Sequence, residues 1–276
     1  MKFAVNVPNF GAFAEPRAFV ALARAAEVAG WDGLFVWDHI LTDEQVPIAD
    51  PWVLLTAAAC ETERIRLGTM VTPLPRRRPW KLARELATLD QLSNGRMILG
   101  VGIGDDSMGE YSSFGEETDE RRHGAMLDEG LEILCGLWSG MPFGFEGKHY
   151  SVRETVFLPP PVQRPRIPIF VAGRWPNRRP MRRAAKWDGV VPVGRDGPLT
   201  PAQCREVIEF THELRPSKEP FEVVVVKPLV FGNTAANHEN AAAFEAAGAT
   251  WFEVGFSGSD GVERVMEAVK AGPPRR

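Results

Sequence analysis

Short apolar runs and helix-patterned segments alternate along the chain, most clearly between residues 64 and 115. Residues 64–72 are apolar and β-compatible, and residues 97–103 (MILGVGI) carry no charge, which is typical of a parallel strand buried on both faces. The segment between them predicts a helix that begins near Pro79 and ends at Asn94-Gly95, because these residues suit the first turn and a positive φ. Its apolar face consists of Leu82, Leu86 and Leu89. The three segments form one βαβ unit.

The same alternation extends over the rest of the sequence. Strands are expected at residues 2–8, 33–39, 64–72, 97–103, 168–173, 189–194, 221–230 and 250–256. Further helices are expected from Pro16 to Gly30, at 121–139 with Leu127, Leu131, Leu134 and Trp138 facing inward, after a Thr200–Gln203 capping box, and after a Ser259-Asp260 cap. Residues 140–167, rich in Gly, Pro and aromatics, read as a hairpin and a loop. The pattern predicts an α/β fold, a (β/α)8 TIM barrel with an insertion after the fourth strand-helix unit, forming one domain over residues 1–276.

Composition narrows the class of protein. The chain has 276 residues, 44% hydrophobic and 25% charged, with a net charge of -4, which gives no reason to expect nucleic acid or an anionic membrane as a partner. No signal segment or long apolar stretch occurs, so a cytoplasmic protein is expected. The odd, scattered Cys60, Cys135 and Cys204 are interpreted as buried, reduced thiols.

Three glycines alternate near the end of the fourth expected strand. Gly100, Gly102 and Gly104 would all point to one side of the pleat, where something approaches the backbone closely. Two interpretations remain open: tight packing of barrel layers, or a flat ligand across the strand's end. The dinucleotide fingerprint is excluded, because Asp105 and Ser107 stand where its third glycine would be.

The segment LGTMVTPLPRRRPWKLARELATLDQLSNGRMILGVGIG resembles the luciferase-like monooxygenase superfamily of flavin- and coenzyme F420-dependent oxidoreductases. The resemblance extends to the DH after the second strand, to FEGKHY and to AAKWDG, and it weakens after about residue 195. It implies a TIM barrel that binds a flavin-type ring, with coenzyme F420 or FMN as the cofactor.

Candidate catalytic residues lie where strands are expected to end, since TIM barrels build their active sites at the carboxyl ends of the strands. His39 is the one histidine of five at such a position, and an imidazole can exchange a proton near neutral pH. In similar deazaflavin enzymes an Asp-His pair here touches the coenzyme, which implies that role for Asp38 and His39. Asp105 stands where some relatives have a catalytic glutamate, and Glu110 lies in the recurrent E-Y-x-x-F-G. The alternative interpretation is that both carboxylates are solvated charges on a loop and have no catalytic role.

The resemblance also implies where the cofactor lies. Similar proteins have a non-proline cis peptide at the position of Met70-Val71, which supports the back of the ring, and the ring would cover Gly102 and Gly104. A phosphate needs backbone N–H groups or a basic clamp, and Gly173-Arg174 with Gly194-Arg195 could supply both. The list of cofactor-binding candidates is Asp38, His39, Met70, Val71, Gly102, Gly104, Gly173, Arg174, Gly194 and Arg195. A rival phosphate site at residues 255–261 ranks second, because Asp260 would repel the anion.

Other barrel chemistries fit poorly. Residues 6–9 lack the His-x-His of metal-dependent hydrolases, so no metal is expected. Lys227 alone is a weak candidate for Schiff-base chemistry, and no nucleophile elbow occurs.

The favoured function is hydride transfer with coenzyme F420 to or from a small organic substrate. The alternatives are an FMNH2-dependent monooxygenase that uses O2 and a separate flavin reductase, or a non-catalytic flavin-binding protein. The loops at 40–50, 105–120 and 140–165 are expected to select the substrate. Trp52 and Trp80, expected to be exposed, suggest a homodimer.

Overall fold

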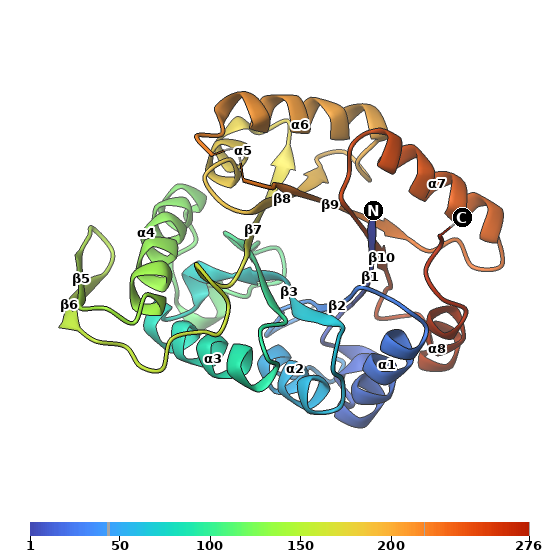
Figure 1. Ribbon diagram of the computed structural model, residues 1–276, viewed down its shortest axis with the longest axis horizontal. Coiled ribbons are helices and arrows are strands. Elements are labelled where there is room, and N and C mark those ends of the chain that lie inside the picture. The colour runs from blue at the N-terminus through green and yellow to red at the C-terminus, as the bar shows by residue number, and fades with distance from the viewer. Residues whose placement is uncertain (43–44, 218, 276) are drawn as a thin grey trace.

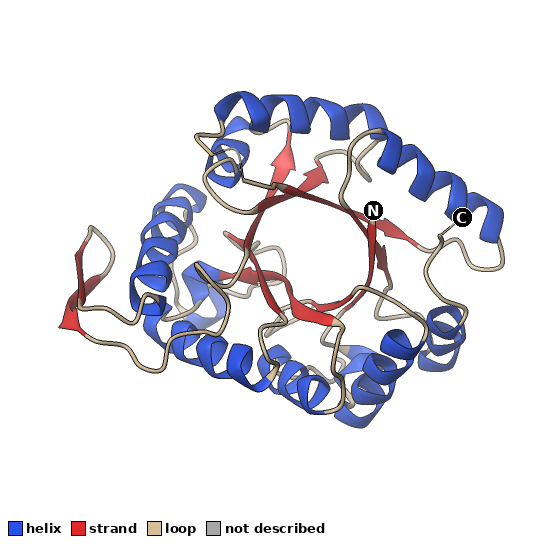
Figure 2. Ribbon diagram, viewed as in Figure 1, coloured by secondary structure: helices blue, strands red, loops and turns tan. Residues whose placement is uncertain are grey.

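The computed structural model describes residues 1–42, 45–217 and 219–275, and within them a closed barrel of parallel strands forms the centre of the molecule. The strand order around the barrel is β1-β10-β9-β8-β7-β4-β3-β2, and every neighbouring pair is parallel. Figure 1 looks down this barrel, and Figure 2 shows the ring of strands enclosed by helices. The predicted TIM barrel is therefore confirmed.

The barrel strands are β1 (Lys2–Val7), β2 (Gly33–Val36), β3 (Arg66–Pro73), β4 (Met97–Gly102), β7 (Ile169–Trp175), β8 (Gly189–Gly194), β9 (Glu222–Pro228) and β10 (Trp251–Gly255). The helices are α1 (Pro16–Val28), α2 (Pro51–Cys60), α3 (Pro79–Leu92), α4 (Glu120–Trp138), α5 (Arg178–Ala184), α6 (Pro201–Leu214), α7 (Thr234–Ala246) and α8 (Val262–Lys270). Short 3-10 turns occupy Gly11–Ala14, Leu74–Arg76 and Ser112–Phe114. The predicted insertion contains the antiparallel hairpin β5 (Phe143–Glu146) and β6 (Ser151–Thr155), which projects outside α4 (Figure 1).

Two apolar layers stabilise the barrel. The larger lies between strands and helices, and it contains the predicted inward faces of α3 and α4. The smaller fills the barrel itself with side chains from all eight barrel strands, namely Ala4, Phe35, Met70, Ile98, Phe170, Val191, Val224 and Trp251. Because side chains alternate along a strand, residues two positions further along also face the interior. The barrel is thus a packed core, whose upper end forms the mouth.

Local signals place several element ends correctly. Asn94 and Gly95 have positive φ after α3, and Thr200 with Gln203 forms the predicted capping box of α6. The helix α2 was not identified from the sequence, because its apolar residues surround the helix and give no stripe. The cap predicted for α8 is wrong: the N-cap is Gly261, and the Asp260 carboxylate instead accepts a hydrogen bond from Ser257 N–H.

Burial corrects two further expectations. Cys204 is buried and Cys135 partly buried, with burial raising the pKa of each thiol to about 11, but Cys60 is exposed at the end of α2. Trp80 is 39% exposed as expected, whereas Trp52 is only 5% exposed because it packs into the core.

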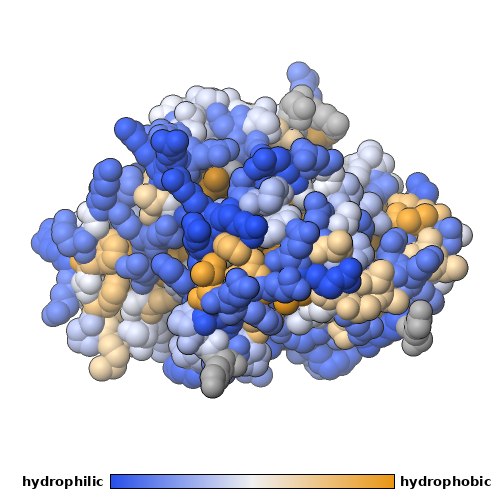
Figure 3. Space-filling model, turned by 90° about the horizontal axis from the view of Figure 1, so that it is seen from above, coloured by the Kyte–Doolittle hydropathy of each residue, from blue (hydrophilic) through white to orange (hydrophobic). Residues whose placement is uncertain are grey.

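The surface in Figure 3 is mainly hydrophilic, with small apolar areas. None of the described helices is both long enough and apolar enough to cross a membrane. The homodimer remains a prediction.

Candidate active site

The backbone of His39 is held at the mouth of the barrel by the side chain of Asn9. The chain leaves β2 after Val36, three residues earlier than the sequence predicted, so Asp38 and His39 lie in the loop that follows. The buried Asn9, just after β1, accepts a hydrogen bond from His39 N–H at 3.1 Å and donates to its carbonyl at 2.7 Å. One amide side chain thus satisfies both polar groups of the His39 backbone and fixes its position.

The His39 imidazole is oriented by Glu110. Its Nδ1 lies 3.1 Å from Glu110 Oε2, and its side chain remains 27% exposed. An ionised carboxylate can only accept hydrogen bonds, so Nδ1 carries a proton and Nε2 is the nitrogen left for a ligand. The sequence placed both residues in the site, and the structure brings them into contact.

Glu110 is buried and ionised. Burial opposes its charge, but the hydrogen bonds from His39 and from Ile40 N–H (2.7 Å), together with the Arg76 guanidinium at 2.6 Å, outweigh burial and lower its pKa. A carboxylate with three donors is suited to orient His39 rather than to donate a proton. Arg76 was not singled out from the sequence, although the Arg76-Arg77-Arg78 run soon after β3 was a visible signal.

The Asp38 carboxylate is fully enclosed by donors of the protein. It accepts from Thr72 Oγ1 at 2.9 Å, from Arg76 at 3.1 Å and from Arg77. Its side chain is 0% exposed. Asp38 therefore neutralises the two arginines, one of which also holds Glu110; a direct contact between Asp38 and a coenzyme stays a prediction.

The third strand bulges beside the glycines of β4. The pairing of β3 with β4 shifts between Thr69 and Thr72, and the Met70-Val71 peptide bond is cis, as the resemblance implied. A Cβ on Gly100 would lie 2.4 Å from Thr69 O and 2.6 Å from Met70 Sδ. The absence of a side chain at Gly100 lets the bulge approach β4, so the packing interpretation holds at this position.

The other two glycines differ from Gly100. Gly102 ends β4, and a Cβ there would meet Val71 Cγ2 at 3.2 Å. Gly104 lies beyond the strand with φ +80, beside the Tyr111 hydroxyl, so the expected alternation on one face ends at Gly102. Val71 is partly exposed, and the other interior residues at the mouth are small: Ala172, Val226 and Gly255. A low apolar floor beside an imidazole fits a flat ring system.

Asp105 lies on the loop after β4, where its side chain is 43% exposed. Hydrogen bonds from Ser107 and the ion pair with Arg174 at 2.6 Å lower its pKa. Asp105 is thus an ionised surface carboxylate, and its assignment as a catalytic residue stays a prediction.

The predicted phosphate residues lie together around the start of α5. Arg195 N–H donates to Trp175 O, and the Arg195 guanidinium donates to Asn177, the N-cap of α5. A Cβ on Gly173 would meet Pro180 at 2.3 Å, and one on Gly194 would meet Gly197 O at 2.2 Å. Close packing therefore explains why both positions are glycine. Phosphate binding by Arg174 and Arg195 stays a prediction.

A buried polar chain inside the barrel was missed from the sequence. Glu253 is the acidic residue of the otherwise apolar β10, and it is 0% exposed. Asn6 connects it to Trp37 through two hydrogen bonds of 2.6 Å each. The signal was a lone glutamate within WFEVG at a position whose side chain faces the barrel interior.

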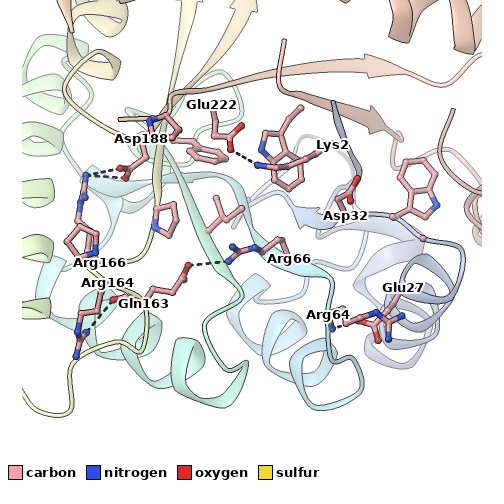
Figure 4. A pocket seen from close by; sticks show the side chains of 18 residues that line it. Lys2, Glu27, Asp32, Arg64, Arg66, Gln163, Arg164, Arg166, Asp188 and Glu222 are labelled. Atoms are coloured by element: carbon pink, nitrogen blue, oxygen red, sulfur yellow. Dashed lines mark hydrogen bonds and ion pairs between the residues drawn. The ribbon is translucent and has the colours of Figure 1, made fainter. Parts of the chain in front are cut away.

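A pocket of about 620 Å³ lies at the opposite end of the barrel. Figure 4 shows it lined by charged residues at strand starts, with Lys2 bonded to Glu222 at 2.5 Å and Arg66 donating to Gln163 at 3.2 Å. Its ion pairs hold the lower end of the barrel together, and this end of a TIM barrel contributes to stability.

Fold and site together define a TIM-barrel protein with an imidazole–carboxylate pair at the carboxyl ends of its strands. The model of the luciferase-like monooxygenase family matches residues 1–271, and the chain belongs to that family.

Among similar proteins, an F420-dependent glucose-6-phosphate dehydrogenase of Beutenbergia cavernae is 38% identical over 168 residues, 59% of this chain. The match covers 48% of that relative, so the chain corresponds to about half of its length.

Solved structures share the fold. The monooxygenase RslO1 from Streptomyces bottropensis superposes with a TM-score of 0.78 at 23% identity over 98% of this chain and 97% of its own. An F420-dependent secondary alcohol dehydrogenase in complex with an F420-acetone adduct gives 0.79 at 18% identity over 100% and 99%.

Proposed function

We propose that this chain is an oxidoreductase that transfers a hydride between coenzyme F420 and a small organic alcohol or carbonyl compound. The observation that carries the proposal is the His39–Glu110 pair, in which the carboxylate occupies one imidazole nitrogen of a side chain that stays 27% exposed at the mouth of the barrel. The F420-dependent relatives favour the deazaflavin over FMN.

Different residues around the mouth bind the cofactor and transfer the proton. The bulge at Met70-Val71 and the side-chain-free Gly102 beside it would provide an apolar seat for the ring, and Arg174 with Arg195 would bind the cofactor's phosphate. When bound, the deazaflavin supplies the hydride chemistry. His39 Nε2 takes the hydroxyl proton when an alcohol loses its hydride, and it returns a proton to the oxygen when a carbonyl carbon gains one. Glu110 keeps the imidazole oriented.

The first experiment titrates the protein with coenzyme F420 and with FMN side by side, using absorbance and fluorescence. We expect F420 to bind more tightly, and anaerobic turnover with a panel of alcohols and ketones. Activity that requires reduced FMN and O2 would instead favour a monooxygenase, which needs a separate flavin reductase. Binding without turnover on any substrate would favour the non-catalytic alternative.

The second experiment tests His39. We expect His39→Ala to lower turnover by about 10²-fold or more, as for loss of a general acid–base. The matched control is His212→Ala, an exposed histidine on α6, which should leave the rate unchanged. Equal rates for wild type and His39→Ala would remove His39 from the mechanism.

A further inference from the structure

Three aromatic rings form one wall beside the proposed ring seat. The centroids of Phe10 and Trp37 are 5.7 Å apart, those of Phe10 and His39 5.7 Å, and those of Trp37 and His39 5.8 Å. The interplanar angles of 65°, 76° and 62° are edge-on contacts that aromatic pairs prefer. All three side chains are partly exposed, and they lie at the ends of β1 and β2, next to the bulged β3. We call this trio the aromatic wall.

The indole of Trp37 is held by a chain of hydrogen bonds in which the donor and the acceptor of each bond can be assigned. Trp37 Nε1–H can only donate, so its acceptor at 2.6 Å must be the amide oxygen of Asn6. That contact sets the orientation of the Asn6 amide and turns its NH2 group toward Glu253 Oε2, also at 2.6 Å. The chain runs from β2 through β1 to β10, across two strand boundaries of the closed barrel.

The far end of this chain is a carboxyl group without a second partner. Glu253 Oε1 is buried and has no hydrogen bond, while Oε2 accepts from Asn6. Burial raises the pKa of Glu253 to about 8, against a smaller opposing effect of the Asn6 hydrogen bond. Its neighbours on the flanking strands are Ala4 and Val226, and the nearby Lys227 directs its ammonium to Leu199 O at 3.4 Å. Burial thus favours the neutral form of Glu253, and Oε2 accepts the Asn6 hydrogen bond at the end of the chain.

We propose that the aromatic wall contacts the planar or apolar body of the substrate, and that Glu253 positions the Trp37 indole for this contact through Asn6. The proposal rests on the proposed function and adds the substrate class: an alcohol or ketone with an aromatic or cyclic apolar body, rather than a polyol phosphate. The two cations beside the proposed ring seat support this choice, because buried carboxylates already neutralise them. Arg76 and Arg77 both hold Asp38, and Arg76 also holds Glu110.

The first test measures binding of two probes to the protein loaded with coenzyme F420, by isothermal titration calorimetry. Acetophenone should bind, and glucose 6-phosphate should not bind at the same concentration. Trp37→Ala should weaken acetophenone binding by about tenfold. Trp37→Phe, which keeps an aromatic body, should weaken it less, and both variants should retain their affinity for F420.

The outcomes separate this inference from the proposed function. If the wild type fails to bind F420, the proposed function is wrong. If F420 binds but glucose 6-phosphate binds better than acetophenone, or if acetophenone binds wild type and Trp37→Ala equally, the aromatic wall is not the substrate surface.

The second test addresses positioning by Glu253. Protein labelled with 5-fluorotryptophan gives a ¹⁹F NMR resonance for Trp37, assigned as the one missing from Trp37→Phe. We expect Glu253→Leu to shift or broaden this resonance, and Glu253→Gln, which mimics the neutral acid, to restore it. Glu222→Gln, at the opposite end of the barrel, is the matched control. An unchanged Trp37 resonance in Glu253→Leu would overturn the positioning role.

Discussion

His39 Nδ1 lies 3.1 Å from Glu110 Oε2, although 71 residues separate the two in the chain. The contact joins the loop after β2 to the loop after β4, and Arg76 from the turn after β3 holds Glu110 from the other side at 2.6 Å. The proton on Nδ1 and the availability of Nε2 both follow from this one contact. The tautomer of His39 therefore depends on the position of Glu110, a carboxylate that itself carries no proton.

Glu110→Gln tests this dependence. The amide removes the negative charge that favours a proton on Nδ1, so we expect turnover to fall by about 10²-fold, while affinity for the cofactor changes little. Steady-state kinetics and a binding titration measure the two effects separately. Glu117→Gln, a partly exposed carboxylate of the same β4–α4 connection, is the control and should behave as wild type. Full activity of Glu110→Gln would contradict the orienting role.

Asp38→Asn tests the buried charge network. The change leaves Arg76 and Arg77, whose side chains are 4% and 18% exposed, without their shared carboxylate. We expect the free energy of unfolding to drop by about 3–5 kcal/mol, measured by urea denaturation. Glu61→Gln breaks the exposed pair with Arg24 and should cost less than about 1 kcal/mol. Equal effects of the two substitutions would show that the Asp38 network adds nothing to stability.

Gly100→Ala tests the close approach of β3 and β4. The new methyl group would lie 2.4 Å from Thr69 O, a backbone atom that can move only with the bulge. We expect a loss of about 1–3 kcal/mol in stability, together with weaker cofactor binding. The control is Gly261→Ala, where a Cβ has nothing within 4 Å, so that only a change of the α8 N-cap, worth less than about 1 kcal/mol, is expected. Thermal unfolding compares the stability of the two variants. A Gly100→Ala protein as stable as the wild type would show that the bulge can shift freely.

The buried acid Glu253 makes stability depend on pH. Its pKa is about 8 in the folded protein and near 4.5 when exposed, so between these values the folded state binds more protons and stability falls as pH rises. Each pKa unit corresponds to about 1.4 kcal/mol, so the cost at pH 8 is several kcal/mol. Glu253→Gln cannot ionise, and we expect it to unfold at higher urea concentration than wild type at pH 8 but not at pH 4. A stability difference between the two proteins that does not vary with pH would argue against a neutral Glu253.

The repeating pattern of the chain predicted most of the fold. Uncharged runs such as 97–103 identify parallel strands, and the leucines of α3 identify a helix, because periodicity reflects which face is buried. Some local signals were weaker than they appeared. Trp52 looked exposed but is buried, and Ser259-Asp260 looked like a cap but the helix begins after Gly261. A short sequence does not reveal which polar group the chain uses as a cap, or which aromatic side chain the next helix covers.

The sequence by itself determined the succession of the barrel strands, the family, and the position of His39 near the end of a barrel strand, since these follow from local patterns and motifs. Only the tertiary structure decided which groups meet there. The partner of His39 comes from 71 residues away, and the acid that holds Asn6 comes from 247 residues away. Closure of the barrel brings the first and last strands side by side, and hydrogen bonds act only over about 3 Å, so spacing along the chain carries no record of them.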